Sequence, residues 1–252
     1  MDVQAWDQIA DQYFDQISSP FEPKVVNPLL EFLERLPRRR QKTVADLGCG
    51  IGNLLPFLAE KFERVVAVDF SPRMLRLARA RCRQQKNIRF HQQSLADLSG
   101  FEESFDVAVT VNSVLSPRLS EIDRIFGRIA ASLKPGGTLA GIFPSLESVL
   151  YEGVLVLDRE RRQSASEEQA LRRARRAMGR DRYDFLAGVF NAGGDRQKFY
   201  YSFELRKRLQ DAGFRAIQFG KVLYPWPQAS SPAGFLGQPR TWDWFVRARR
   251  PE

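Results

Sequence analysis

The sequence predicts an α/β fold: a doubly wound, mostly parallel seven-stranded sheet whose last strand runs antiparallel. Short apolar segments alternate with helical stretches along the first 145 residues, and this alternation is typical of a parallel sheet. Two later apolar segments, residues 214–224 and 241–248, predict an antiparallel pair. The five earlier strands are expected at residues 42–47, 64–69, 88–92, 105–111 and 138–144.

Ahead of the sheet, the first 37 residues predict two helices. Asn27 and Pro28 are typical of the start of the second helix, and Pro37 ends it. In the first helix, apolar residues recur at spacings of three and four, at Trp6, Ile9, Ala10, Tyr13 and Ile17.

A glycine-rich turn follows the first strand of the sheet. Residues 44–53 read VADLGCGIGN, an apolar strand that runs into Gly48, Gly50 and Gly52. Because glycine has no side chain, the backbone N–H groups of such a turn approach a nucleotide closely. Asn53 stands where a dinucleotide-binding fingerprint has its last glycine, so the pattern argues against NAD or FAD.

The second strand, RVVAVD, ends in Asp69, which lies about twenty residues beyond the glycine-rich turn, where a ribose-binding acid is expected. A carboxylate accepts hydrogen bonds from two vicinal hydroxyls at once. Ser71 and Pro72 then predict the start of a helix. Met74 on that helix either contacts the ligand or packs into the core.

Four segments between about residues 43 and 145 resemble the class I, Rossmann-like S-adenosylmethionine-dependent methyltransferases. They are the glycine-rich turn, the Asp69 strand, the FDVAVTV strand that exits at Asn112, and the LKPGGTLAGIF segment of residues 133–143. The resemblance implies S-adenosylmethionine as the cofactor and methyl transfer as the activity. It assigns the following residues to cofactor binding: Asp46, Gly48, Cys49, Gly50, Gly52, Asn53, Asp69, Phe70, Met74, Ser94, Leu95 and Asn112.

The chain departs from this family's pattern at two places. Many relatives carry an acid for the adenine amino group after the third strand, where this chain has Ser94 and Leu95, so we expect backbone groups near Leu95 to bind adenine. Asp97 comes three residues too late for that role. Residues 112–115 lack the Asn-Pro-Pro-Tyr type signature, which reduces the case for a nucleobase or glutamine acceptor.

The predicted division of the chain has four parts. Residues 1–37 are N-terminal helices, which the resemblance makes a lid or cap over the cofactor, and residues 38–145 are the cofactor-binding core. Residues 146–200 are an insertion over the active-site mouth, with two strands around a turn at 191–194. Residues 201–252 supply a closing helix and the last two strands of the same domain.

Methyl transfer from a sulfonium needs little chemistry from the protein beyond alignment of the reactants and exclusion of water. A base is needed chiefly for an oxygen acceptor that must lose a proton. The catalytic group is therefore left unassigned, with Tyr13, Asp195, Tyr200 and Tyr201 as candidates on the acceptor side. Several aromatic residues either line an acceptor pocket or belong to the core: Phe190, Phe199, Tyr200, Tyr201 and Trp226.

The net charge of +9 is concentrated in one segment of the insertion. Residues 159–182 hold nine arginines against four acidic residues. A helix over about residues 167–178 presents these arginines as a solvated face, as a nucleic-acid contact or as a site for an anionic acceptor. No aromatic residues interleave with them as base-stacking platforms would.

Composition limits the remaining possibilities. Two cysteines and one histidine predict neither a disulfide framework nor a metal site, and we expect His91 to be structural. No apolar run approaches the roughly 20 residues of a membrane span, and the acidic N-terminus is unlike a secretory signal, so a cytoplasmic location is expected.

The sequence thus predicts a methyltransferase that acts on a small molecule, aromatic or anionic. Two alternatives stay open: an RNA or protein methyltransferase that uses the arginine-rich insertion, and a non-catalytic cofactor-binding or scaffold protein. The oligomeric state and the acceptor atom are not predicted.

Overall fold

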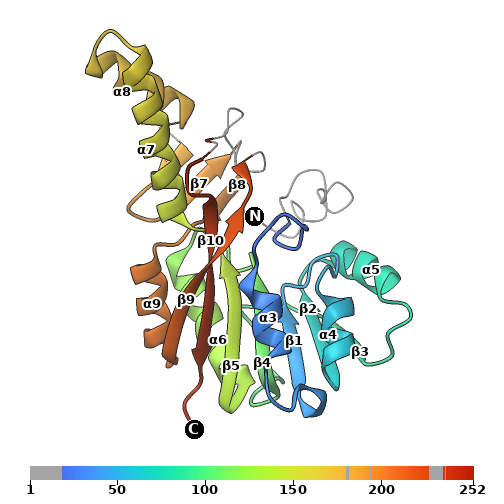
Figure 1. The fold of residues 1–252 in the computed structure, drawn as a ribbon. Helices are drawn as coiled ribbons and strands as arrows, with labels where there is room; N and C mark the ends of the chain where they lie inside the picture. Colours follow the sequence, from blue (N-terminus) through green and yellow to red (C-terminus); the bar gives the residue numbers. More distant parts are fainter. Residues whose placement is uncertain (1–18, 180–181, 193–194, 227–234, 236) are drawn as a thin grey trace.

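The computed structural model describes residues 19–179, 182–192, 195–226, 235 and 237–252 (Figure 1). Its main sheet has seven strands in the order β3-β2-β1-β4-β5-β10-β9. Only β10 runs antiparallel to its neighbours β5 and β9 within this sheet, so the predicted fold class is confirmed. The strands are β1 (Thr43–Leu47), β2 (Arg64–Asp69), β3 (Ile88–Gln92), β4 (Phe105–Val111), β5 (Leu133–Phe143), β9 (Arg215–Tyr224) and β10 (Thr241–Arg249).

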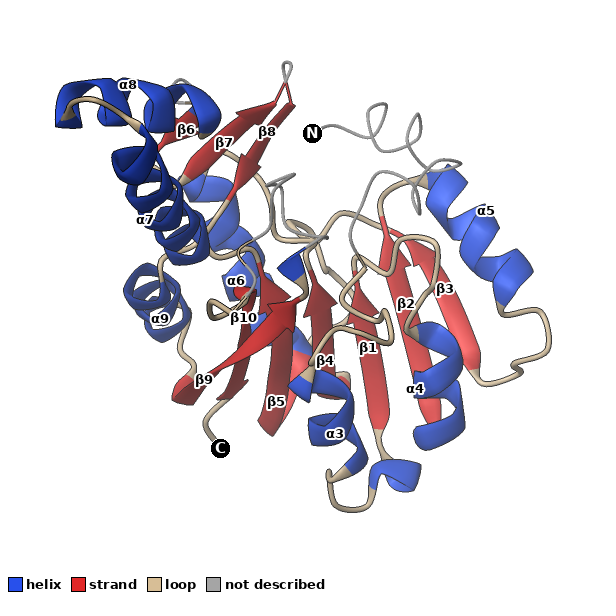
Figure 2. Cartoon of the chain, turned by 45° about the horizontal axis from the view of Figure 1, so that its top comes forward, coloured by secondary structure: helices blue, strands red, loops and turns tan. Residues whose placement is uncertain are grey.

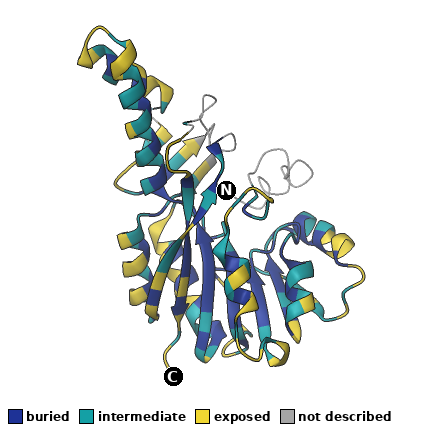
Figure 3. Cartoon of the chain, in the orientation of Figure 1, coloured by how far each residue is buried: buried dark blue, intermediate teal, exposed yellow. Residues whose placement is uncertain are grey.

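Helices cover both faces of this sheet (Figure 2). On one face lie α3 (Pro28–Glu34), α4 (Leu55–Lys61) and α5 (Pro72–Arg81), which pack against Val44 and its neighbours. On the other lie α6 (Leu119–Ser132) and α9 (Ser202–Asp211), which pack against Ala45 and its neighbours. Adjacent residues of β1 thus enter opposite cores, and the sheet interior is almost entirely buried (Figure 3).

The N-terminal predictions are tested only in part. The first predicted helix, with Trp6 and Tyr13, falls in residues 1–18, outside the described residues. The second is confirmed as α3, where the Asn27 side chain accepts a hydrogen bond from the Leu29 N–H at 2.9 Å and Pro28 occupies the first turn. A 3-10 helix, Arg39–Gln41, leads into β1.

Two local features concern the start of β5 and the start of α9. Strand β5 begins at Leu133, which pairs with Phe105, five residues before the start predicted for the fifth strand. The register then shifts and pairing resumes at Thr138, because Gly136 takes a left-handed φ of 71° that displaces this stretch. Ser202 does not cap α9, since its N–H and hydroxyl both donate to Glu147.

Between β5 and α9 the chain forms a separate layer that extends beyond the end of the sheet (Figure 1). It consists of α7 (Leu146–Gln163), α8 (Glu167–Ala177) and an antiparallel sheet of β6 (Tyr183–Asp184), β7 (Val189–Ala192) and β8 (Asp195–Lys198). The predicted hairpin and arginine-rich helix are therefore both present. In α8, Ala170 and Ala174 are buried, whereas Arg172, Arg173, Arg175 and Arg176 are exposed.

The two ends of this layer meet at one point. Ser145 and Tyr200 form an isolated parallel bridge, the Tyr200 N–H donates to the Pro144 carbonyl at 2.8 Å, and the Leu146 N–H donates to the Tyr200 carbonyl at 3.0 Å. The chain therefore leaves the main sheet and returns to it at adjacent residues. None of the described helices combines the length and apolar character that a bilayer span requires.

Replacing Phe126 by alanine is expected to lower the free energy of unfolding by about 3–5 kcal/mol, because the ring is fully buried and packs against Phe143 and Tyr200. The matched control is Phe203→Ala, at a ring that is 68% exposed on α9, with an expected change below about 1 kcal/mol. Urea unfolding of both variants measures the difference, and equal losses would contradict the packing described here.

Candidate functional site

A cavity of about 580 Å³ opens at the carboxyl edge of the main sheet. One side of it is built by residues that follow β1, β2 and β3, and the other by the loop after β4, the start of α6 and strand β8. The first side comprises Gly48, Gly50, Asp69, Phe70, Met74, Ser94 and Leu95. The second comprises Val111, Asn112, Ser113, Leu115, Ser116, Pro117, Arg118, Glu121, Ile125, Arg196 and Gln197.

The glycine-rich turn contributes to the cavity in two distinct ways. Gly48 has a φ of 79°, and a Cβ there would lie only 2.2 Å from the Ser113 Cβ, so Gly48 allows two loops to pack. Gly50 has a φ of 52°, lines the cavity, and would have no heavy atom within 4 Å of an added Cβ. A ligand in the cavity therefore meets open space and backbone at Gly50.

Asp69 connects this turn to the next helix. Its carboxylate accepts hydrogen bonds from the Gly50 N–H at 2.8 Å and from the Ser71 N–H at 2.9 Å. Ser71 in turn caps α5 by accepting the Met74 N–H at 3.0 Å. These two backbone contacts fix the orientation of the carboxylate.

Four of the residues predicted to bind cofactor do not line the cavity. Asp46 and Cys49 are buried behind the turn. Gly52 allows the turn to pack against α5, since a Cβ there would lie 3.1 Å from the Ala78 Cβ. The Asn53 side chain accepts a hydrogen bond from Arg81. These residues support the turn from behind, whereas the other eight predicted residues all lie at the cavity.

Of the catalytic candidates, Tyr200 and Tyr201 do not line the cavity. Tyr200 is fully buried, and its hydroxyl donates to the Val114 carbonyl at 2.6 Å. Tyr201 donates to the Phe185 carbonyl at 3.0 Å. Asp195 begins β8 and pairs with Ala192, Tyr13 lies outside the described residues, and the catalytic group stays unassigned.

The other aromatic candidates, Phe190, Phe199 and Trp226, pack against aromatic rings. Phe190 and Phe199 join Tyr183 in a cluster within the small sheet, with ring centroids 4.7–6.2 Å apart. Trp226 is buried and packs against Tyr151. His91 meets the Phe101 ring edge-on at 5.0 Å, which agrees with the expected structural role.

Charged residues on the second side of the cavity were not predicted. Glu121 accepts hydrogen bonds from the Ser116 hydroxyl at 2.7 Å and from the Arg118 guanidinium at 2.7 Å. Arg196 is exposed at the cavity and has no carboxylate partner within the described part of the chain. The strand itself was predicted as part of the hairpin around residues 191–194, and Asp195 was the site candidate named on it.

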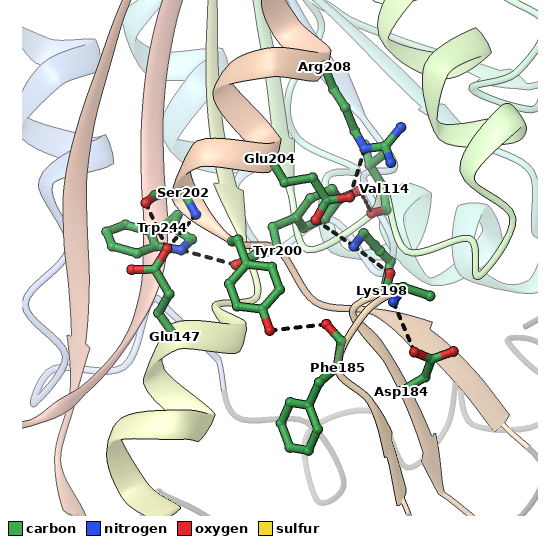
Figure 4. A network of polar contacts seen from close by, with 12 residues as sticks. Val114, Glu147, Asp184, Phe185, Lys198, Tyr200, Ser202, Glu204, Arg208 and Trp244 are labelled. Carbon is green, nitrogen blue, oxygen red and sulfur yellow. Dashed lines mark hydrogen bonds and ion pairs between the residues drawn. The ribbon is translucent and has the colours of Figure 1, made fainter. Parts of the chain in front are cut away.

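A buried ion pair attaches β8 to the core (Figure 4). Lys198 has no exposed side-chain surface, pairs with Glu204 at 2.7 Å and donates to the Ala187 carbonyl at 2.7 Å. Its backbone N–H donates to the Leu115 carbonyl at 2.9 Å. Glu204 also accepts from Arg208 at 2.8 Å. Strand β8, which carries Arg196 and Gln197, is thereby joined to the loop after β4.

Burial, followed by the nearby charge of Asp69, raises the pKa of Asp46 from 3.8 to about 7. Folding therefore takes up a proton between these pH values, and the free energy of unfolding falls as pH rises toward 7 and just beyond it. A metal site is a separate question. Among the described residues, no group of three or more His, Cys, Asp or Glu side chains could hold a metal ion.

Asp46→Asn removes this titration, so the variant's stability relative to the parent protein is expected to increase from pH 5 to pH 8, by about 3 kcal/mol at most. Urea unfolding at the two pH values measures it. Asp158→Asn, at a half-exposed carboxylate on α7, is the control and should show the same relative stability at both. A pH-independent difference for Asp46→Asn would show that its carboxyl titrates as in the unfolded chain.

The sequence has relatives among known enzymes. Residues 44–137 match the family model of a methyltransferase domain. Trans-aconitate 2-methyltransferase of Deinococcus radiodurans is 33% identical over 118 residues, which make up 47% of this chain and 44% of that protein. The matches to such relatives span less than half of the relatives' own length.

The fold is shared with solved structures. An S-adenosylmethionine-dependent methyltransferase of Methanosarcina mazei has a TM-score of 0.63 at 21% identity, over 90% of this chain and 98% of its own. The 1,6-didemethyltoxoflavin-N1-methyltransferase of Burkholderia thailandensis has a TM-score of 0.61 at 18% identity, over 99% and 85% of the two chains. Residues 44–137 thus match a methyltransferase domain, and the chain shares its Rossmann-like fold with these solved methyltransferases.

Proposed function

We propose that this chain transfers a methyl group from S-adenosylmethionine to a small-molecule acceptor that carries an anionic group. One cavity carries this proposal, because it joins the glycine-rich turn and Asp69 on one side to Arg196 of β8 on the other. Two ligands that share a cavity of about 580 Å³ meet inside it, as direct transfer between them requires.

The cofactor side fits an adenosyl group by its chemistry. Asp69 offers a carboxylate, held by two backbone contacts, to the ribose hydroxyls. Phe70, Met74 and Leu95 offer apolar surface to the adenine ring, and Gly50 offers backbone without a side chain. The bound cofactor supplies an already activated methyl group. The B. thailandensis enzyme of the same fold was solved with S-adenosylhomocysteine, which agrees with this choice of cofactor.

The chain's own contribution to the reaction is then to bind the cofactor and the acceptor, to orient them toward each other and to enclose them. Among the residues that the structure describes, the second side of the cavity holds no imidazole, and its one carboxylate, Glu121, accepts hydrogen bonds from Ser116 and Arg118. An acceptor that already bears the attacking lone pair, such as a carboxylate, needs no proton removed. An ionised acceptor is therefore the class that this set of residues suits.

Arg196 favours such an acceptor. A guanidinium binds a carboxylate through two parallel hydrogen bonds, and Arg196 lacks a carboxylate partner in the described residues. Arg118 is less available because it pairs with Glu121. The D. radiodurans relative is named for the methylation of trans-aconitate, which agrees with an anionic acceptor.

The alternatives receive less support. The exposed arginines of α8 do not line the cavity, so an RNA or protein acceptor would have to reach it from a distance. A scaffold protein that has lost cofactor binding is disfavoured, because Asp69 still accepts the Gly50 N–H and the space at Gly50 is open. The lid at residues 1–37 stays a prediction. The cytoplasmic location also stays a prediction, and the two buried free cysteines agree with it, because disulfides are rare in cytosolic proteins.

Wild-type protein is expected to bind S-adenosylhomocysteine in calorimetric titration, and Gly50→Leu is expected to weaken this binding by tenfold or more, because its side chain would enter the open space. The matched control is Gly100→Leu, whose glycine also has a positive φ, 84°, and open surroundings but does not line the cavity. Absence of binding by the folded wild type would refute the proposal, and equal effects of the two variants would refute the site.

Arg196→Gln is expected to raise the KM for small carboxylic acid acceptors by about tenfold or more, the cost of one charge-assisted contact, with S-adenosylhomocysteine affinity within twofold of wild type. Transfer of a labelled methyl group to a panel of such acids measures it. Arg175→Gln on α8 is the control and should change nothing with these acids. Transfer to RNA that depends on Arg175 and not on Arg196 would instead favour the macromolecular alternative.

A further inference from the structure

Asn112 has an unusual conformation and an unsatisfied side chain. It follows β4, lines the cavity, and has a left-handed φ of 48°, which few residues other than glycine adopt. Its side-chain nitrogen donates a hydrogen bond to Asp243 at 3.2 Å. Its side-chain oxygen is buried and has no hydrogen-bond partner in the part of the chain that the structure describes. A buried acceptor without a donor is costly unless a ligand supplies one.

Asp243 and Tyr224, which lie on the last two strands, hold the Asn112 amide. The Asp243 oxygen that accepts from Asn112 also accepts from the Tyr224 hydroxyl at 2.8 Å. Asp243 lies on β10 and Tyr224 on β9, and Tyr224 is buried. Burial raises the pKa of both Asp243 and Tyr224. An acceptor at this position requires the NH₂ end of the Asn112 amide, so the oxygen must occupy the opposite end.

The order of strands indicates which ligand group lies near Asn112. Along the sheet edge, residues after β3, β2, β1 and β4 follow one another, as Leu95, Asp69, Gly50 and Asn112. The cofactor's groups follow one another as adenine, ribose, sulfonium and amino acid. With ribose at Asp69 and adenine near Leu95, the amino-acid end reaches β4. An amide oxygen accepts from an ammonium group and not from a carboxylate.

We infer that Asp243 and Tyr224 are positioning residues, which hold the Asn112 amide so that its oxygen accepts a hydrogen bond from the ammonium group of the bound cofactor. This inference rests on the proposed function. It gives a ligand-binding role to two residues of the last two strands, neither of which lines the cavity.

Calorimetric titration with two ligands tests the inference. S-adenosylhomocysteine carries the amino-acid group, and 5′-methylthioadenosine keeps the adenosine and the sulfur without it. Asn112→Gly preserves the left-handed backbone while it removes the amide. It is expected to weaken S-adenosylhomocysteine binding by tenfold or more and to leave 5′-methylthioadenosine within twofold of wild type.

Two milder variants test the positioning itself. Asp243→Asn replaces the carboxylate by a neutral amide, which is a weaker acceptor for the Asn112 amide and the Tyr224 hydroxyl, so S-adenosylhomocysteine affinity is expected to fall several-fold. Tyr224→Phe is expected to lower S-adenosylhomocysteine affinity by a smaller factor and, like Asn112→Gly, to leave 5′-methylthioadenosine affinity unchanged. Tyr201→Phe, which removes a hydroxyl that donates to Phe185, is the matched control and should change neither affinity.

The outcomes separate the two levels of the hypothesis. Selective loss of S-adenosylhomocysteine binding in the order Asn112→Gly, Asp243→Asn, Tyr224→Phe supports the inference. If wild type binds both ligands and Asn112→Gly binds both equally well, or loses both equally, the inference is overturned while the proposed function stands. If the folded wild type binds neither ligand, the proposed function fails and the inference fails with it.

Discussion

The two backbone hydrogen bonds accepted by Asp69 join three segments at the cavity: the glycine-rich turn, the end of β2 and the start of α5. Through Gly50 they set the position of the turn, and through Ser71 they set the first turn of the helix that carries Met74. A single carboxylate thus fixes the floor of the cavity before any ligand binds. Such preorganisation lowers the entropic cost of binding.

The opposite side of the cavity depends on a different interaction. Lys198 is a fully buried cation, and a buried charge without a partner is strongly destabilising. Glu204, the Ala187 carbonyl and the backbone contact to Leu115 together supply its partners and fix the register of β8. Because side chains alternate along a strand, this register decides which residues of β8 face the cavity. The buried ion pair in the core therefore determines which side chains β8 presents to the second side of the cavity.

The sequence was sufficient to predict the fold and most of the residues on the first side of the cavity, because β1 to β4 are short apolar segments whose exits meet at one edge. The predictions failed where long-range contacts decide. Tyr200 was a catalytic candidate by composition, but its ring completes the core beside Phe126. Arg196 was missed because the face of β8 is set by Lys198 and Glu204, which no local pattern reveals. Likewise, the partner of Asn112 lies 131 residues further along the chain.

The adjacent ends of the layer between β5 and α9 have an evolutionary consequence. Since Ser145 and Tyr200 are bridged, the intervening residues form a closed excursion from the main sheet, and closing a longer loop costs only slightly more entropy than closing a shorter one. Insertions or deletions there leave the pairing of β5 with β4 and β10 unchanged. The segment between Ser145 and Tyr200 can therefore change in length and sequence while the glycine-rich turn and Asp69 keep their positions.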